Sequence, residues 1–382
     1  MEEWKEYKLE EVCSRLRSGK GIKSDCISNI GLFPVIGGNG MRGYTNKSNF
    51  KGECAVIGRQ GANCGNVRFF MGEAYMTEHA VVAVGNELAD SYFLARLLSL
   101  MHLGNLSAQS AQPGLSIQTL SKQIIRLPSI SYQREISTVL KSLDDKIELN
   151  RRINDNLEQQ AQALFKSWFV DFEPFKKGKF IDSELGMIPE GWQVEELGNI
   201  TNSITEKVGK RTDIKVLSPV NTGELLLSEE YFTKQVYSKN LAKYIMVAPN
   251  DFSYNPARIN IGSIGMNTFD FSGCVSPVYV VFRCEKGYHH FFNIFKTTKN
   301  FKEEINTRAI GGVRQTLSYK DFSLIKIVYP PKEVVEQFNK IYSHIMTLIK
   351  KNVLENKRLH QTRDTLLPKL MSGELKINDI NN

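Results

Sequence analysis

Three kinds of string in this 382-residue chain come near the motifs of enzymes that act on nucleic acids. A phosphate-binding loop needs Gly-x-x-x-x-Gly-Lys followed by Ser or Thr, because backbone amides cradle the phosphates and the hydroxyl holds magnesium. The string Val208–Thr212 contains Gly-Lys, but Ile204 stands where the first glycine belongs and Arg211 where the hydroxyl belongs. This string therefore predicts no ATPase.

The second kind is Asn255-Pro256-Ala257-Arg258, which resembles the Asn-Pro-Pro-Tyr motif of adenine methyltransferases. It lacks the second proline and the aromatic ring that stacks on a flipped base. The third kind is Glu-x-Lys, at Glu6–Lys8 and Glu374–Lys376, and neither string has a convincing partner aspartate for a metal-dependent nuclease. The sequence predicts no catalytic residue, no cofactor and no enzymatic activity.

The six cysteines predict neither a metal site nor a disulfide framework. They contain no Cys-x-x-Cys pair, and no histidine stands near them at ligand spacing. Buried thiols in a reduced, cytoplasmic protein are the simplest interpretation. The acidic start of the chain is unlike a signal peptide, and no apolar run is long enough to cross a bilayer.

The elements that position the side chains are repeated along the chain. A length of 382 residues favours two or three domains. Leu115-Ser116 recurs as Leu317-Ser318, 202 residues later, and the same offset holds without a gap for about fifty residues. Each half opens on Trp-x₄-Leu, at Trp4–Leu9 and Trp192–Leu197, at a different offset. The order within each half is therefore an opening, a variable stretch, a Leu-Ser to Pro segment and a long tail.

Both tails are predicted to be helices with a coiled-coil seam, because apolar residues recur at alternating spacings of three and four. Pro128 and the pair Pro330-Pro331 stop either helix from extending backwards. Both seams carry two asparagines at matching positions, namely Asn150, Asn154, Asn352 and Asn356. A buried asparagine costs stability but fixes pairing, so we expect the helices to pack antiparallel with these residues meeting near the middle. Alternatively, the asparagines face solvent.

The stretches between the openings and the tails have the pattern of compact α+β domains. Short β-rich runs, such as Glu53–Gly58, Ala80–Val84 and Ser276–Phe282, alternate with glycine-rich loops. Helical patterns occur from Ser91 to Met101 and near His290 to Ile305. The predicted fold class is α+β, with two β-rich globular domains separated by two long helices packed as an antiparallel coiled coil.

The order of these features resembles the specificity subunits of type I restriction-modification systems. The resemblance covers essentially the whole chain and depends on the duplicated openings, the Leu-Ser segments and the Leu127-Pro128 and Tyr329-Pro330 pairs. The junction Leu164–Phe175, followed by Gly186–Trp192, is especially typical of that family. The resemblance implies target-recognition domains at residues 1–130 and 176–330, and conserved spacer helices at 131–175 and 331–382.

In that family each variable domain reads one half of a split site in double-stranded DNA. The resemblance further implies that two methyltransferase subunits dock on the helices and that a separate motor-nuclease subunit supplies cleavage. One departure is that the second seam has Arg363 where the first has Ala161, which puts the equivalence of the two docking faces in doubt.

The formal net charge of +8 fits a polyanionic partner, and the chain has no basic tail, so contacts with DNA must come from folded surfaces in both halves. The candidates are polar and basic residues of the loops, which can reach phosphates or base edges. In the first domain they are Asn39, Arg42, Tyr44, Arg59, Gln60 and Arg68. In the second domain they are Lys210, Arg211, Tyr254, Asn255, Arg258, Asn260 and Arg314. For each of them an ordinary solvated role is the alternative, and for the whole chain it is a coiled-coil scaffold that binds other proteins.

Overall fold

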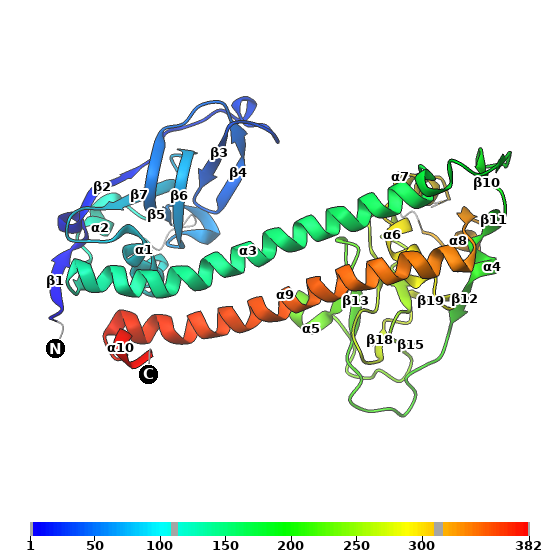
Figure 1. Cartoon of the computed structure of the whole chain (residues 1–382). Helices are drawn as coiled ribbons and strands as arrows, with labels where there is room; N and C mark the ends of the chain where they lie inside the picture. Colours follow the sequence, from blue (N-terminus) through cyan, green and yellow to red (C-terminus); the bar gives the residue numbers. More distant parts are fainter. Residues whose placement is uncertain (1–2, 108–113, 309–315, 381–382) are drawn as a thin grey trace. The chain divides into compact units, whose positions relative to one another are not determined.

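The computed structural model describes residues 3–107, 114–308 and 316–380. The chain divides into two compact units, shown in Figure 1. Unit 1 comprises Met1–Arg152 and Asn352–Asn382, and unit 2 comprises Ile153–Lys351. Two long helices, α3 (Ile130–Phe169) and α9 (Lys332–Ser372), each contribute one segment to either unit. Each unit therefore contains a β-rich domain together with one half of the helix pair.

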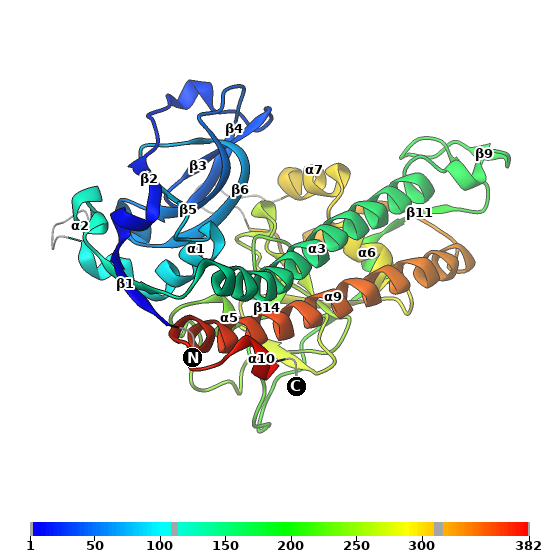
Figure 2. The ribbon, with the colours of Figure 1, turned by 60° about the vertical axis from the view of Figure 1, so that its left-hand side comes forward.

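Unit 1 is built on a six-stranded sheet in the order β2-β7-β5-β6-β3-β4 (Figure 2). All neighbours in it are antiparallel except β3 and β6. The strands are β2 (Cys13–Ser18), β3 (Phe33–Gly37), β4 (Gly40–Thr45), β5 (Phe50–Gly58), β6 (Val67–Met76) and β7 (Ala80–Gly85). Their side chains alternate between the two faces, as the strand geometry requires.

One face of this sheet packs against helix α1 (Ser91–Leu100). Ala55, Ile57 and Val81 share a buried cluster with Leu94 of α1 and Leu140 of α3. Helix α1 begins where the sequence provides a cap, because the Asp90 side chain accepts a hydrogen bond of 2.8 Å from the backbone amide of Phe93. The first face thus fixes the sheet to the helix pair.

Unit 2 has a smaller sheet of four short strands in the order β12-β19-β16-β17. These strands are β12 (Thr201–Ile204), β16 (Phe252–Tyr254), β17 (Ile264–Met266) and β19 (Val280–Cys284). Further two-stranded pairs surround it: β9 (Phe180–Ile181) with β10 (Ile188–Pro189), β13 (Leu217–Pro219) with β14 (Leu225–Leu227), and β15 (Ile245–Val247) with β18 (Gly273–Val275). Short helices follow at α5 (Ser228–Tyr231), α6 (His289–Phe295) and α7 (Lys299–Arg308).

The core of unit 2 is aromatic. Phe252 stacks on Phe282 at a centroid distance of 5.2 Å, and Phe292 of α6 meets Phe252 edge-on at 4.9 Å. Phe165 of α3 lies 5.4 Å from Phe291 of α6, so the helix pair and the domain share this core. Such pairs add to the stabilisation that comes from burying the rings.

The predicted duplication is visible as the same four elements in each unit. In unit 1, β1 (Lys5–Lys8) pairs antiparallel with β8 (Ile124–Leu127), and in unit 2, β11 (Gln193–Glu196) pairs in the same way with β20 (Lys326–Tyr329). A short helical turn follows each opening strand, at Leu9–Val12 and at α4 (Leu197–Ile200). The helices α2 (Ile117–Ser121) and α8 (Tyr319–Ser323) precede the closing strands.

The repeated Leu-Ser string has a physical explanation in these elements. Ser116 caps α2 by accepting a hydrogen bond of 2.9 Å from the amide of Thr119, and Ser318 caps α8 from the amide of Asp321 at 3.2 Å. Both preceding leucines are buried. Each Leu-Ser string therefore anchors a chain segment in the core and starts a short helix.

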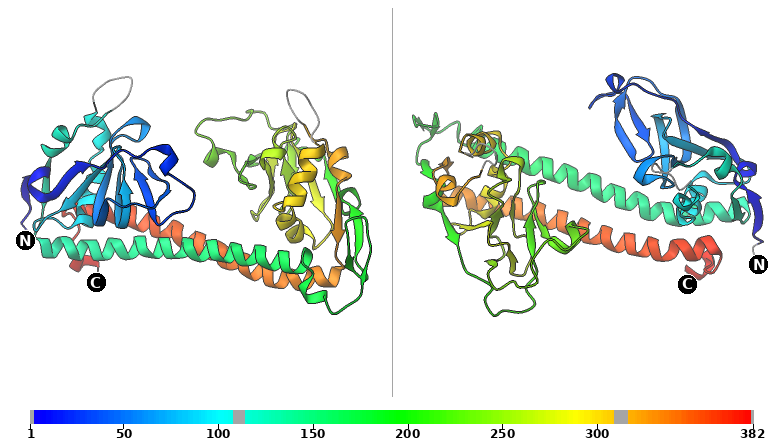
Figure 3. Two further views of the ribbon diagram at one scale, coloured as in Figure 1. Left: turned by 90° about the horizontal axis from the view of Figure 1, so that it is seen from above. Right: turned by 180° about the vertical axis from the view of Figure 1, so that it is seen from behind.

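The predicted long helices and their antiparallel pairing are confirmed within each unit (Figure 3). In unit 1 the buried Asn150 of α3 donates hydrogen bonds of 2.9 Å to Asn356 and Glu355 of α9, while Asp144 meets Arg363. Asn150 follows Asp144 along α3, whereas its partner Asn356 precedes Arg363 along α9, so the two helices run antiparallel. In unit 2, Asn154 donates to the carbonyl oxygen of Ile349 at 3.4 Å.

Two of the predicted elements differ in extent from the structure. The β-rich run Ser276–Phe282 becomes a strand only from Val280, because Ser276 accepts the backbone bond of a turn that Tyr279 donates. The helical pattern from His290 to Ile305 is divided into α6 and α7, since neither helix includes Lys296 to Thr298.

Candidate nucleic-acid interface

The second face of the unit 1 sheet carries a row of arginines. Arg15 and Arg17 of β2 stand opposite Val84 and Val82 of β7, and Arg68 of β6 stands opposite Val56 of β5. These three valines belong to a separate apolar cluster, which lies on the face that α1 does not cover. The three guanidinium groups are therefore presented on one face of one sheet.

Arg15 has little to neutralise its charge. Its guanidinium lies 5.4 Å from the centre of the Phe50 ring, and its Nε has no hydrogen-bond acceptor within the described residues. Burial and the neighbouring Arg17 lower the pKa of Arg15, although a guanidinium stays protonated at neutral pH. Uncompensated positive charge of this kind suits a polyanion.

The turn between β3 and β4 lies beside Arg68. Arg68 donates a hydrogen bond of 2.5 Å to the backbone oxygen of Asn39. Gly40 has a φ of +104°, a backbone conformation that favours glycine, and a Cβ there would displace the Arg68 guanidinium, which would stand 2.1 Å away. Asn39 and Arg68, both exposed candidates from the sequence, are thus brought together.

The other candidates of unit 1 lie around this pair. Arg42 is exposed on β4, whereas Tyr44 is half-buried and its backbone pairs with Ser28. Arg59 reaches the hydroxyl of Ser18 at 3.5 Å, at the end of β2. Gln60 is exposed and forms a backbone bridge with Gly114.

The candidates of unit 2 lie in two places. Lys210 and Arg211 are exposed in a turn whose backbone pairs with Ala242 and Tyr244, and Arg211 forms an ion pair of 2.5 Å with Glu206. Arg258 and Asn260 are exposed at the turn between β16 and β17. Arg314 lies outside the described residues.

Tyr254 and Asn255 have structural roles in unit 2. Tyr254 is fully buried, and its ring lies 5.4 Å from that of Phe322, so the side chain is not available to DNA in this structure. Asn255 accepts a hydrogen bond of 3.0 Å from the amide of Ala257 and shapes the turn.

Sequence reasoning missed Arg15 and Arg17. The signal was present, because Cys13-Ser-Arg-Leu-Arg-Ser18 alternates as a strand does, with Leu16 turned to the core and the arginines turned away. Its recognition required knowing which face of the sheet the helices cover.

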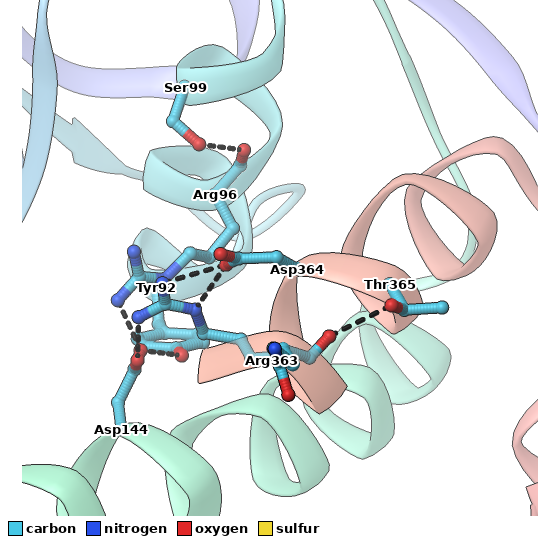
Figure 4. A network of polar contacts seen from close by, with 8 residues as sticks. Tyr92, Arg96, Ser99, Asp144, Arg363, Asp364 and Thr365 are labelled. Atoms are coloured by element: carbon cyan, nitrogen blue, oxygen red, sulfur yellow. Dashed lines mark hydrogen bonds and ion pairs between the residues drawn. The ribbon is translucent and has the colours of Figure 1, made fainter. Parts of the chain in front are cut away.

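A network of charges ties α1 to both long helices in unit 1 (Figure 4). Asp144 of α3 accepts hydrogen bonds from Tyr92 at 2.5 Å, from Arg363 at 2.8 Å and from Arg96. Burial and the bond to Asp144 raise the pKa of Tyr92. The network fixes the domain that carries the arginine row to its helices.

The described residues contain no group of three or more histidines, cysteines and acidic residues that could hold a metal ion. Burial raises the pKa of the Cys13, Cys54 and Cys274 thiols to about 12, which disfavours the reactive thiolate. None of the described helices combines the length and apolar character needed to span a membrane.

Comparison with known proteins decides the family. A family model described as the type I restriction modification DNA specificity domain matches residues 1–159. The MjaIX specificity subunit of Methanocaldococcus jannaschii, a type I restriction enzyme subunit, is 30% identical over 311 residues, which cover 73% of this chain and 67% of the relative. The chain belongs to the specificity subunits of type I restriction-modification enzymes.

Two further comparisons agree with this. The HindI specificity subunit of Haemophilus influenzae is 26% identical to this specificity subunit over 330 residues, covering 69% of this chain and 71% of the relative. The crystal structure of the type I S subunit from M. genitalium matches with a TM-score of 0.65 at 15% identity, covering 97% of this chain and 96% of that one. That likeness confirms the fold.

Proposed function

We propose that this specificity subunit reads double-stranded DNA through its two β-rich domains, each taking one half of a bipartite site. The observation that carries the proposal is the duplication: β1, β8, α2 and α3 recur as β11, β20, α8 and α9, whereas the domains between them differ. We assign the reading domains to residues 1–130 and 176–330 and the spacer helices to 131–175 and 331–382. A frame that is repeated within the chain around two different domains suits a protein that binds two different half-sites and presents similar surfaces to its partners.

The proposed contacts in unit 1 are the arginine row together with Asn39, Arg42, Arg59 and Gln60. In unit 2 they are Lys210, Arg211, Arg258 and Asn260, all of them exposed. Arginine serves both purposes in DNA recognition, because it neutralises phosphates and can bind the edge of guanine through two hydrogen bonds.

We propose further that two methyltransferase subunits dock on the helix pair and that a motor-nuclease subunit joins the complex. The chain itself then needs no catalytic group and acts in the cytoplasm. The solvent-facing sides of the helices support docking, since Leu149, Val353 and Leu354 are exposed apolar residues on α3 and α9.

Exchange of one domain tests whether each β-rich domain reads its half-site independently of the other. Replacing residues 1–130 by the equivalent domain of a relative is expected to change one half of the methylated sequence and leave the other half intact. The measurement is a map of methylated adenines made with the reconstituted complex, and the purified chain alone, given DNA, magnesium and S-adenosylmethionine, is expected to leave the DNA unmodified. A change in both halves contradicts independent reading, and turnover by the isolated chain contradicts the non-catalytic role.

The arginine row predicts a loss of affinity that depends on salt. Arg17→Ala and Arg68→Ala are each expected to weaken DNA binding several-fold and to lower the slope of log affinity against log salt by about 1, since each removes about one phosphate contact. The measurement is fluorescence anisotropy at several salt concentrations. Arg126→Ala is the matched control, because Arg126 is exposed on β8, which is not part of the six-stranded sheet. Equal losses in all three variants would show a general charge effect and refute the assignment.

A further inference from the structure

The two units differ where the long helices meet their globular domain. In unit 1, Arg363 of α9 lies between the helix pair and the globular domain and binds Asp144 of α3 (Figure 4). At the repeat offset of 202, Arg363 corresponds to Ala161 and Asp144 corresponds to Met346. Ala161 and Met346 both line a cavity of about 620 Å³ inside unit 2. An internal ion pair in one unit is thus replaced by an open cavity in the other.

The cavity has an apolar floor and an acidic mouth. Its floor includes Leu225, Met266 and Ile294, which are almost completely buried. Three exposed carboxylates line it as well, those of Glu158, Glu224 and Glu230. The single basic residue of the lining is Lys296, so three negative groups and one positive group leave a formal charge of −2.

Among these carboxylates, Glu224 is the one whose charge stabilises the ammonium of Lys296. Its side chain is 8% exposed, and its Nζ donates a hydrogen bond of 2.7 Å to the backbone oxygen of Gly223. Burial lowers the pKa of Lys296 to about 8, so the ammonium is still mostly protonated at neutral pH. At the mouth, burial and the neighbouring carboxylates of Asp155 and Glu224 raise the pKa of Glu158. The lining of the unit 2 cavity is therefore acidic overall and contains no guanidinium.

We propose that this cavity binds a small organic cation, a guanidinium or primary ammonium on an aliphatic stem. Its head would sit among Glu158, Glu224 and Glu230, and its stem would lie over the methionines and Leu225. The volume is in the range of small-molecule sites. Bound there, the cation joins the 222–226 segment to α3, as Arg363 joins α9 to α3 in unit 1. The site is independent of DNA recognition.

The test is a calorimetric titration of the purified full chain with agmatine, which carries both kinds of cationic head on a four-carbon stem. Saturable binding with one molecule per chain is expected, with a dissociation constant below about 1 mM. The double variant Glu158→Gln/Glu230→Gln is expected to bind at least tenfold more weakly. Glu229→Gln is the matched control, because Glu229 lies on the same short helix as Glu230 but outside the lining.

A filling variant provides the second arm. Ala161→Arg supplies the guanidinium internally and is expected to abolish agmatine binding and to raise the unfolding temperature. Butyrate, which has the stem without the positive charge, is expected not to bind. Absence of saturable binding by the native chain overturns the proposal, and so does equal binding by Glu229→Gln and the double variant. If Ala161→Arg does not fold, the comparison of the glutamine variants decides alone.

Discussion

Asp144→Asn is expected to lower the free energy of unfolding of unit 1 by about 3 kcal/mol. Asp144 is the shared acceptor of two guanidinium groups, and the side chains of Asp144, Arg96 and Arg363 are 18%, 21% and 19% exposed. The amide keeps the shape of the side chain but removes its charge, so two half-buried cations face each other without their common counter-ion. Urea unfolding followed by peptide-resolved hydrogen exchange measures unit 1 separately from unit 2.

The matched control is Asp364→Asn. Asp364 also accepts from Arg363, at 2.7 Å, but its side chain is 63% exposed, and exposed ion pairs contribute less than about 1 kcal/mol. Combining Asp144→Asn with Arg363→Gln is expected to restore part of the lost free energy of unfolding, because the single variant is destabilised by an unpaired positive charge. Equal effects of the two aspartate variants, or no recovery in the double variant, would contradict this account.

The long helices were predictable because their information is local. Heptad spacing places Ile136, Leu140, Ile345 and Ile349 on buried seams, and the prolines before Ile130 and Lys332 determine where the helices begin. The repeat offset then made an asparagine contact between the helices foreseeable. The structure brings Asn150 and Asn356 together, and Asn154 donates a hydrogen bond to the backbone oxygen of Ile349.

The residues that we propose as DNA contacts were harder to predict than the helices, because in unit 2 the strands around them are only three residues long. Tyr254 belongs to a strand of three residues, too short to show the alternation that would have assigned it to the core. The glycine-rich turn near Asn39 suggested an exposed loop, but its position beside Arg68 comes from a contact between distant parts of the chain. Exposure of single residues is thus a tertiary property here.

The difference between Arg363 and Ala161 likewise could be located in the sequence but not interpreted from it. Aligning the two seams identifies the two residues. Their surroundings depend on a third helix, because α1 brings Arg96 and Tyr92 to the seam in unit 1, whereas Ile294 of α6 lines the cavity in unit 2. One position therefore supports an ion-pair network in one unit and leaves space in the other.

Lengthening both long helices is expected to increase the distance between the two halves of the DNA site, a prediction that rests on the proposed function. Four residues inserted after Arg152 and four more after Lys351 lengthen both helices where they pass from one unit to the other, so the contacts inside each unit are kept. Four helical residues add about 6 Å and turn the helix by about 400°, only about 40° beyond a full turn. We expect the methylated site to gain one or two base pairs between its halves, because B-DNA rises about 3.4 Å per pair. Methylation mapping of the reconstituted complex measures this.

The matched control inserts two residues at each of the same points. Two residues turn each helix by about 200° about its own axis and add about 3 Å, so the seams of α3 and α9 cannot face each other in both units along unbroken helices. We expect this variant to lose methylation of any bipartite site, although each unit keeps its own core and both variants have similar helix content by circular dichroism. Methylation at the original spacing by the four-residue variant, or full activity of the two-residue variant, would show that the helices do not set the distance between half-sites.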